Sequence, residues 1–377
     1  MQKRLYTALA FVVMSAMVLS ACGAQPTQPP APTPVPPTAV PPTAVPPTAV
    51  PPTAAPLPGT GFLICQVTDT GGIDDKSFNA TAWKGVTDAE ALLGVTGQYL
   101  ESQQQTDYER NINAFLGQDC DLIITVGFLL ADATAAAADA NPDVNFSIVD
   151  VNWLSQPNIL QQAFQTDQAA FLAGYLAAGV SQTGVIGTFG GMQIPTVTIF
   201  MDGFYMGAQY YNEQHGTSVR VLGWDPATQT GLFTGNFEST DDGRRMGESL
   251  MDEGADIILP VAGPVGLGTA AAILERGNAY IIGVDADWYL TAPDYASIEL
   301  TSVMKNMDVT TLEAIQAVVD GTFAGGLVTG TLANGGVGLA PYHDLASLVS
   351  ADLQAELDTV RQGIIDGTIS VAPPAAQ

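Results

Sequence analysis

Residues 62–79 read FLICQVTDTGGIDDKSFN, and this stretch decides the fold that we expect. The apolar run 62–67 is typical of a short buried strand, and a helical pattern begins at Ser77. Between them lies a polar turn, in which Gly71 and Gly72 allow the chain to bend sharply. A strand, a turn and a helix in this order form the first half of a βαβ unit, the building block of a parallel sheet.

The same alternation continues along the chain in two series, which meet near Asp167. Strands that alternate with helices of this length imply parallel sheets, so we expect an α/β fold with two doubly wound lobes. Two uncharged stretches, 168–201 and 257–274, are broken by turn residues and fit buried strands better than membrane spans. The predicted strands are 62–67, 98–100, 122–126, 146–149, 184–189, 218–223, 256–260 and 280–284, and the predicted helices are 77–92, 108–116, 131–140, 168–180, 196–213, 242–253 and 266–276.

Composition excludes several functions. The chain has 377 residues, with 11 Lys and Arg against 38 Asp and Glu and a net charge of −27. A nucleic-acid partner is disfavoured because phosphate binding requires a basic face, and adsorption to anionic lipid through basic patches is disfavoured for the same reason. Two His and three Cys, without paired metal-ligand spacing, give no basis for a metal site, and we predict no catalytic residue and no cofactor.

The first 60 residues predict an export signal followed by a spacer. Lys3 and Arg4 precede the apolar run 8–19, as in a secretory signal peptide of residues 1–21. Cys22 follows Leu-Ser-Ala, which resembles a bacterial lipobox and implies lipidation of Cys22; an ordinary signal peptide is the alternative. The apolar run is short of the ~20 residues that span a bilayer. Residues 22–60 are rich in Pro and Thr, with Pro-Pro-Thr-Ala-Val repeated over residues 36–50, and predict an extended stalk.

Polar residues near the first strand and near residue 305 carry the expected chemistry. Asp69 lies at the carboxyl end of a strand, where open α/β sheets bind ligands. We expect Asp69, Phe78 and Asn79 to contact a ligand, whereas Asp74, Asp75 and Ser77 fit helix caps better. Lys305 follows an apolar strand-like run, so a purely solubilising role for this lysine is unexpected; a surface ion pair is the alternative. Cys65 and Cys120 are predicted to be buried free thiols, with a disulfide as the alternative.

Several ordered motifs resemble the basic membrane protein family of lipoproteins, which includes purine nucleoside receptors of ABC importers. The resemblance spans about residues 61–345. The motifs are TDTGGIDDKSFN (68–79), LIITVG (122–127), AAFLAG (169–174), DGFYMG (202–207), GAD (254–256), AGPVGLG (262–268), GVDAD (283–287) and TSVMKN (301–306).

The resemblance implies a type I periplasmic-binding-protein fold, whose two lobes are joined by hinge strands and close on a ligand. It assigns residues 61–166 and about 291–322 to the first lobe, and residues 167–290 and about 323–372 to the second. In the nucleoside-binding members of the family, the base is stacked between two aromatic rings, and an Asp and a Lys hold the ribose hydroxyls.

Carried over by motif, the site has contributions from both lobes. Phe78 is one stacking ring, and Phe237 is the second, with Phe233 as its rival. Asp285 and Lys305 hold the ribose, and the glycine-rich turn brings backbone close to the ligand. The implied ligand-binding residues are Asp69, Phe78, Asn79, Asp167, Phe237, Gly263, Gly266, Asp285 and Lys305, with Gly268 in the same turn.

Two departures from the family pattern leave the exact ligand open. Trp288 stands where the family has Gln, and the run 262–266 replaces a Gly-Gly-Thr run. The predicted function is a receptor, lipid-anchored on the outer face of the cell membrane, that delivers a nucleoside, with a purine favoured, to an ABC permease. The alternatives are a receptor for another polar solute, such as a sugar or a signal molecule, and a nucleoside-processing enzyme. Oligomeric state stays open.

Overall fold

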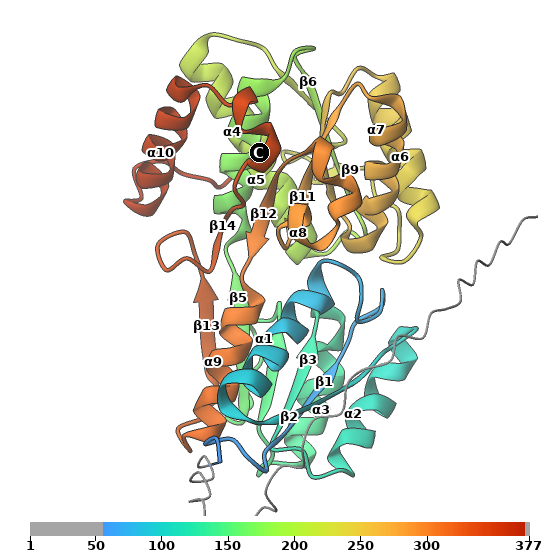
Figure 1. The fold of residues 1–377 in the computed structure, drawn as a ribbon, viewed down its shortest axis with the longest axis vertical. Coiled ribbons are helices and arrows are strands. Elements are labelled where there is room, and N and C mark those ends of the chain that lie inside the picture. The colour runs from blue at the N-terminus through green and yellow to red at the C-terminus, as the bar shows by residue number, and fades with distance from the viewer. Residues whose placement is uncertain (1–55, 374–377) are drawn as a thin grey trace, which may run out of the picture. The chain divides into compact units, whose positions relative to one another are not determined.

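The computed structural model describes residues 56–373, which belong to a compact unit of residues 55–377. The predicted signal peptide, Cys22 and the stalk up to residue 55 lie outside the described residues. Two lobes, each built on its own sheet, make up this unit (Figure 1). None of the helices in residues 56–373 is long and apolar enough to cross a membrane.

The sheet of the first lobe is entirely parallel, in the order β13-β5-β4-β3-β1-β2. Along β1 the side chains alternate between two cores, since Ile64 packs on one face with α1 and Cys65 on the other with α2 and α3. Helix α9 packs beside α1. The elements of this lobe are β1 (Leu63–Val67), α1 (Phe78–Leu93), β2 (Thr96–Leu100), α2 (Tyr108–Leu116), β3 (Leu122–Val126), α3 (Ala131–Ala140), β4 (Phe146–Val149), β5 (Ile159–Phe164), α9 (Met307–Val319) and β13 (Gly326–Gly330).

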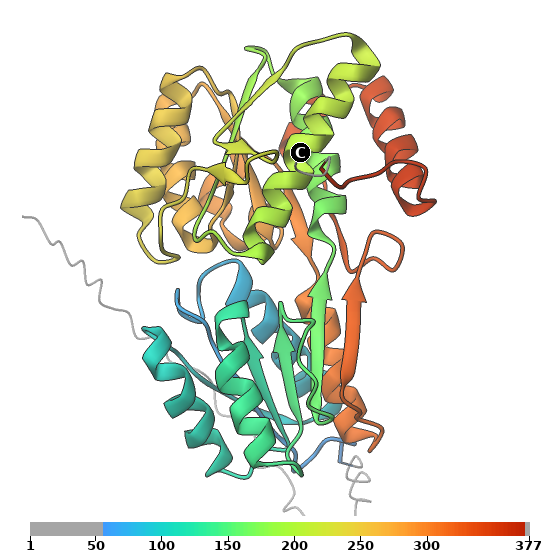
Figure 2. The same ribbon diagram turned by 180° about the vertical axis from the view of Figure 1, so that it is seen from behind.

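The second lobe has a six-stranded sheet in the order β14-β12-β11-β10-β6-β7, in which only β14 is antiparallel to its neighbour. Helix α10 lies on the outside of this lobe, beside α4 (Figure 2). Its elements are α4 (Thr166–Val180), β6 (Val185–Gly190), α5 (Pro195–His215), β7 (Arg220–Leu222), a ribbon of β8 (Trp224–Asp225) and β9 (Thr230–Gly231), α6 (Thr240–Asp252), β10 (Ile257–Val261), α7 (Gly266–Arg276), β11 (Tyr280–Asp285), α8 (Trp288–Thr291), β12 (Glu299–Lys305), β14 (Val337–Leu339) and α10 (Ala351–Ile365).

Five short 3₁₀ helices complete the described part of the chain. Two of them, η2 and η3, directly follow strands β3 and β10 and therefore lie at the carboxyl edges of the two sheets. They are η1 (Gln105–Asp107), η2 (Phe128–Leu130), η3 (Gly263–Val265), η4 (Pro293–Ile298) and η5 (His343–Leu348).

The two-lobed α/β fold is confirmed, but the lobe boundaries near the C-terminus were wrong. β12 pairs with β11 of the second lobe, although residues 291–322 were assigned to the first. β13 pairs with β5 of the first lobe, although residues 323–372 were assigned to the second. The chain therefore crosses between lobes after β5, after β12 and after β13. The crossings are hard to place from sequence because buried strands look alike in both lobes.

The prediction of two free thiols was also wrong, because Cys65 and Cys120 form a disulfide. Their levels along neighbouring strands had argued against pairing. Cys120 precedes β3, however, and follows Asp119, whose φ of 55° is left-handed. Asp121 N donates to Leu63 O at 2.8 Å, which holds this loop against β1. The loop rather than the strand thus brings the second thiol to Cys65.

The chain enters the first lobe at the amino ends of its strands. Gly59 N donates to Leu93 O, at the end of α1, with a distance of 2.7 Å. Leu57 packs against Gly94, where a Cβ would lie 2.7 Å from the Leu57 Cβ. Residues 57–59 are therefore fixed to the edge of the sheet that lies opposite the carboxyl ends of the strands.

Candidate ligand-binding site

A cavity lies between the two lobes, at the carboxyl ends of their strands. Its empty volume, which includes the open solvent at its mouth, is about 590 Å³. Asp69, Phe78 and Asn79 line it from the first lobe, and Phe237 and Asp285 from the second. We refer to it as the main cavity.

Four of the five charged residues that line the main cavity come from the ends of strands. Asp69 follows β1, Asp150 follows β4, Asp285 ends β11 and Lys305 ends β12. Asp150 and Asp285 have φ values of 68° and 69°, which are strained for residues other than glycine. Such strain occurs where the surrounding structure holds a functional side chain in place.

Lys305 and Asp150 form a buried ion pair across the lobes. The Lys305 Nζ lies 2.6 Å from Asp150, and the two side chains are 3% and 8% exposed. The same Nζ lies 4.8 Å from the centre of the Phe78 ring and 5.8 Å from that of Phe200, within the range of cation–π attraction. Burial raises the pKa of Asp150, and the charge of Lys305 opposes this increase.

Asp285 connects the lobes through Ser77. The Ser77 hydroxyl lies 2.8 Å from Asp285 Oδ2 and 3.0 Å from Val284 O. A second interlobe bond runs from the Thr291 hydroxyl to Lys76 O, at 2.8 Å. Burial raises the pKa of Asp285, and the Lys305 charge and the Ser77 bond oppose this increase. The lobes are therefore in direct contact at the edge of the main cavity.

Asp69 and Asn79 are held by the loop between β1 and α1. The Tyr108 hydroxyl and Thr70 N both donate to Asp69 Oδ1. Burial raises the pKa of Asp69 to about 6, although both hydrogen bonds lower it. The Asn79 side chain accepts from Asp69 N at 3.1 Å and contacts Thr70 O at 3.4 Å. Asn79 lines the main cavity, but its polar atoms mainly hold the loop that presents Asp69.

Asp75 has the capping role that its sequence position predicts. Its carboxylate accepts from the backbone N–H groups of Ser77, Asn79 and Ala80, at 2.8–3.0 Å. These are donors of the first turn of α1, which have no partner within the helix. Burial raises the pKa of Asp75 to about 6. Asp75 also lines the main cavity and adds a further carboxyl group there.

Aromatic rings line the main cavity from both lobes. Phe78 and Phe128 belong to the first lobe, and Phe200 and Phe237 to the second. Phe233, the rival of Phe237, instead packs edge-on against Trp224, with 5.9 Å between ring centres. Of the two candidates for the second ring, only Phe237 lies in the main cavity.

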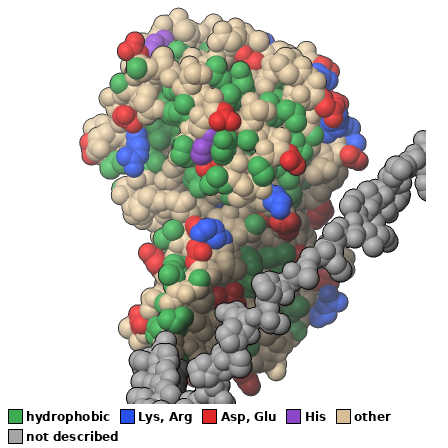
Figure 3. All heavy atoms as spheres, in the orientation of Figure 1, with side chains coloured by type: hydrophobic (Ala, Val, Ile, Leu, Met, Phe, Trp, Pro, Cys, Tyr) green, Lys and Arg blue, Asp and Glu red, His purple; other side chains and the backbone are tan. Residues whose placement is uncertain are grey.

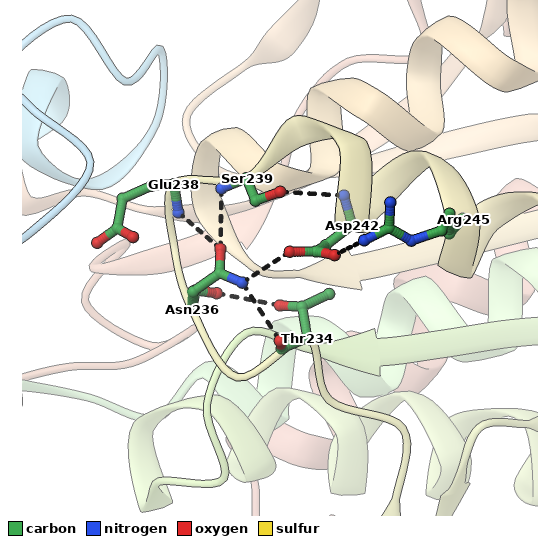
Figure 4. A network of polar contacts seen from close by, with 6 residues as sticks. All are labelled: Thr234, Asn236, Glu238, Ser239, Asp242 and Arg245. Carbon is green, nitrogen blue, oxygen red and sulfur yellow. Dashed lines mark hydrogen bonds and ion pairs between the residues drawn. The ribbon is translucent and has the colours of Figure 1, made fainter.

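A polar network holds the turn that carries Phe237 (Figure 4). The Asn236 side chain accepts from Glu238 N and Ser239 N, at 3.1 and 2.8 Å. It donates to Thr234 O at 3.2 Å and to Asp242 at 3.0 Å. One amide thus joins both sides of the turn to the start of α6, so the position of Phe237 is fixed by its neighbour in sequence.

Three residues that the sequence assigned to the ligand site, Gly266, Gly268 and Asp167, do not line the main cavity. Gly263 lines the main cavity with a φ of 53°, but Gly266 does not line it, since a Cβ there would lie 2.8 Å from the Trp288 ring. Gly268 packs against Thr240 in α6. Asp167 lies in the first turn of α4, where its carboxylate accepts from Gln168 N, and it does not line the main cavity. The glycines after Gly263 therefore serve helix packing.

The two departures from the family pattern have different consequences. Trp288 is buried, and its indole N–H donates to Val284 O at 3.1 Å, so it fills the interior of the second lobe. Pro264 lines the main cavity and lies against Gly71 of the opposite lobe. Of the two departures, only the run 262–266 changes the ligand-facing surface.

Sequence reasoning missed Asp150, Phe128, Phe200 and Thr196, which also line the main cavity. Asp150 follows a buried strand just as Asp69 does, so the strand-end rule could have found it. Phe128 follows β3 in the same way. Phe200 lies inside α5, and the sequence offers no sign that distinguishes it from a core residue. Within residues 56–373, no three His, Cys, Asp or Glu side chains gather in a way that could hold a metal ion.

Comparisons with known proteins agree with this architecture. The family model described as "ABC transporter substrate-binding protein PnrA-like" matches residues 62–373. A Lactococcus lactis protein named "ABC transporter nucleoside-binding protein BmpA" is 32% identical, over 81% of this chain and 87% of its own. An uncharacterised lipoprotein of Pyrococcus horikoshii is 32% identical, over 76% of this chain and 70% of its own.

Among solved structures, a solute-binding protein of an ABC transporter system from Aeropyrum pernix is 28% identical. It superposes with a TM-score of 0.74, and the match covers 83% of this chain and 94% of that protein. Proteins of this class are not enzymes: they work outside the cytoplasm and present a solute to a membrane permease. This chain belongs to the PnrA-like family of ABC-transporter substrate-binding proteins.

Proposed function

We propose that this receptor binds a purine nucleoside in the main cavity. The observation that carries the proposal is that one interlobe cavity brings aromatic rings from both lobes next to Asp285 and the buried Asp150–Lys305 pair. Phe78 and Phe237 offer flat apolar faces to a base, because aromatic groups prefer offset stacking. A nucleoside joins a flat base to a sugar with vicinal hydroxyls, and this site has surfaces suited to both.

Asp285 and Lys305 are the groups that would hold the ribose. A carboxylate that accepts from two hydroxyls makes charge-assisted hydrogen bonds, which are about twice as strong as neutral ones. Lys305 supplies donors to the same region and offsets the buried charge of Asp285. In this arrangement the ligand contacts both lobes, so binding stabilises the closed state.

The charge balance of the cavity favours a nucleoside over a nucleotide. Asp69, Asp75, Asp150 and Asp285 line the main cavity, and Lys305 is the one cation among its described lining residues. The whole chain carries a net charge of −27. A phosphate would enter a negative field, which lowers both its local concentration and its affinity.

Two further features support the assignment to an anchored importer component. The Lactococcus lactis relative is named as a nucleoside-binding protein, and the Pyrococcus horikoshii relative is named as a lipoprotein. The lipobox-like Leu-Ser-Ala-Cys ends at Cys22, ahead of the Pro- and Thr-rich spacer. We therefore propose a lipid anchor at Cys22 on the outer face of the cell membrane and delivery of the nucleoside to an ABC permease.

Thermal melting of residues 55–377 tests the ligand assignment. The protein is first unfolded and refolded to remove any ligand carried through purification, and then melted with inosine, guanosine, adenosine, cytidine, uridine, ribose or GMP. Ligand at 1,000 times its Kd adds about 4 kcal/mol to the free energy of unfolding, which raises the Tm by several degrees. We expect this increase with purine nucleosides and not with ribose or GMP.

Asp285→Asn provides the matched variant, since it keeps the shape of the side chain and removes its charge. We expect it to abolish most of the Tm increase, while Asp241→Asn, at the exposed start of α6, preserves it. Refolded protein that melts at the same temperature with every nucleoside would refute the ligand assignment and leave the family untouched.

A further inference from the structure

A second cavity adjoins the main cavity on the side of the Asp150–Lys305 pair. Phe128, Asp150, Thr196 and Lys305 line both cavities, so the two spaces meet at these residues. The second cavity has an empty volume of about 820 Å³, counted to the solvent at its mouth. We call it the side chamber; the residues that line it alone include Val151, Trp153, Ala163, Phe164, Thr166 and Ile199.

The side chamber is also an interlobe space. Trp153 comes from the loop after β4 of the first lobe, whereas Ile199 lies on α5 of the second. Ala163 lies on β5, just before the chain crosses to α4. A group that occupied the side chamber would therefore contact both lobes, as a ligand in the main cavity does.

The wall of the side chamber is mostly apolar. Phe128 and Trp153 pack together with ring centres 5.0 Å apart, although Trp153 is half exposed. Phe164 and Ile199 extend the apolar surface. Asp150 and Lys305, the two charged residues of this wall, are already paired with each other. The chemistry of this wall therefore suits an uncharged apolar group.

One buried polar atom of the wall has no partner. Thr166 is 1% exposed, and its hydroxyl makes no hydrogen bond with any described residue. An unpartnered buried hydroxyl is unfavourable. A small shift of Thr166 toward the chamber would let the hydroxyl donate to a weak acceptor, such as a thioether sulfur or an ether oxygen next to an alkyl group.

We propose that the receptor takes nucleosides whose 5′ carbon carries an apolar thioether or ether in place of the hydroxyl, with this group in the side chamber. The inference rests on the proposed function, in which Asp285 and Lys305 hold the ribose. Lys305 borders both cavities, so the inference places the 5′ carbon of the ribose at the opening into the side chamber. The base then remains between the rings of the main cavity.

Calorimetric titration of residues 55–377 with adenosine and with 5′-deoxy-5′-methylthioadenosine tests the inference. We expect the methylthio compound to bind about tenfold more tightly, a gain typical of burying a small apolar group. Equal or weaker binding of the methylthio compound, with adenosine still bound, overturns the inference but not the proposed function. If neither compound binds, both fail.

Ala163→Leu supplies the matched variant, because Ala163 borders the side chamber and not the main cavity. We expect it to leave the affinity for adenosine within about twofold and to remove the gain from the methylthio group. Ala135→Leu on α3, which lines neither cavity, is the control and preserves the gain. If Ala163→Leu does not fold, Ile199→Phe fills the same chamber from α5. A filled chamber that keeps the tenfold gain contradicts the inference.

Discussion

Among the described residues that line the main cavity, Lys305 is the one cation, and it offsets the buried negative charge of the carboxylates around it. It is paired with Asp150, its charge opposes the raised pKa of Asp285, and its Nζ faces the Phe78 ring. Burying an ion pair yields little net stability, because desolvation offsets the attraction. Removing one partner is different, since the other charge is then left buried without compensation.

Lys305→Met should therefore lower the free energy of unfolding by about 3–5 kcal/mol at pH 7.5. Burial raises the pKa values of Asp150 and Asp285 above those of the unfolded chain, so both carboxyls accept protons readily in the folded variant. As the pH falls through these raised values, the penalty disappears. We expect urea unfolding to give a smaller difference in the free energy of unfolding between Lys305→Met and the wild type at pH 5 than at pH 7.5.

Lys84→Met is the control for this comparison. Lys84 pairs with Asp88 and Asp308 at the surface, where its side chain is 57% exposed. An exposed pair contributes about 0–1 kcal/mol. A Lys305→Met variant no less stable than Lys84→Met, or one whose deficit grows in acid, would contradict the compensating role of Lys305.

At the scale of residues, the sequence identifies site residues that lie at the carboxyl end of a strand, where open α/β sheets bind ligands. Asp69 was predicted from its place at the end of a strand, and Asp285 and Lys305 from motifs. Asp150 obeys the same rule but was missed, because no glycine-rich turn or helix cap marks the segment after it. Asp167 is the opposite case: it was carried over from the family, but its side chain bonds within the first turn of α4 and does not line the main cavity.

At the scale of elements, helices α4 and α5 of the second lobe approach each other closely. A Cβ on Gly174 would overlap the carbonyl oxygen of Phe204, and one on Gly207 would overlap that of Phe171. Both contacts are with backbone, which cannot move aside as a flexible side chain can. The AAFLAG and DGFYMG motifs therefore end in glycine because each helix presses its backbone against the other.

Gly207→Ala should destabilise the protein by about 1–3 kcal/mol, since the helices must separate to admit the methyl group. Gly179→Ala on α4 is the matched control, because its methyl group would meet the side chains of Leu353 and Tyr211. Alanine also favours helix over glycine by up to ~1 kcal/mol. In denaturant unfolding, the free energy of unfolding of Gly179→Ala should be close to that of the wild type. Equal losses for both variants would refute the backbone-contact explanation.

The elements that sequence predicts best are those with strong periodicity, such as β3 and α2, whose bounds match the prediction. β5, β13 and β14 were not predicted, and each borders a point where the chain passes from one lobe to the other. Each of these strands pairs with a strand far away in the sequence, as β13 does with β5. A local sequence pattern does not encode which strand that partner is. The disulfide was missed for a similar reason, because a loop rather than a strand sets its geometry.

At the scale of the whole molecule, the hydrogen bonds of Ser77 and Thr291 are among the contacts that hold the lobes together beside the main cavity. Ser77 reaches Asp285, and Thr291 reaches Lys76 O. On the face drawn in Figure 3, acidic side chains are scattered rather than gathered in one patch. Their mutual repulsion opposes compaction, so local contacts such as these bias the balance between open and closed forms.

Ser77→Ala should increase the open population of the ligand-free protein about fivefold, because one buried hydrogen bond contributes ~1 kcal/mol. Small-angle X-ray scattering of residues 55–377 measures this as a larger radius of gyration, which saturating ligand should reverse. Ser181→Ala is the control, since its hydroxyl bonds Asp256 at 2.7 Å within the second lobe. An unchanged scattering curve for Ser77→Ala would show that this bond does not control closure.

Under the proposed anchoring at Cys22, the two lobes have unequal mechanical roles. Residues 57–59 contact the first lobe at Leu93 and Gly94, at the edge farthest from the main cavity. The first lobe would then be the one held near the membrane, and the second lobe would move relative to it about the three chain crossings. Loading with solute would thus reach a permease mainly as a displacement of the second lobe.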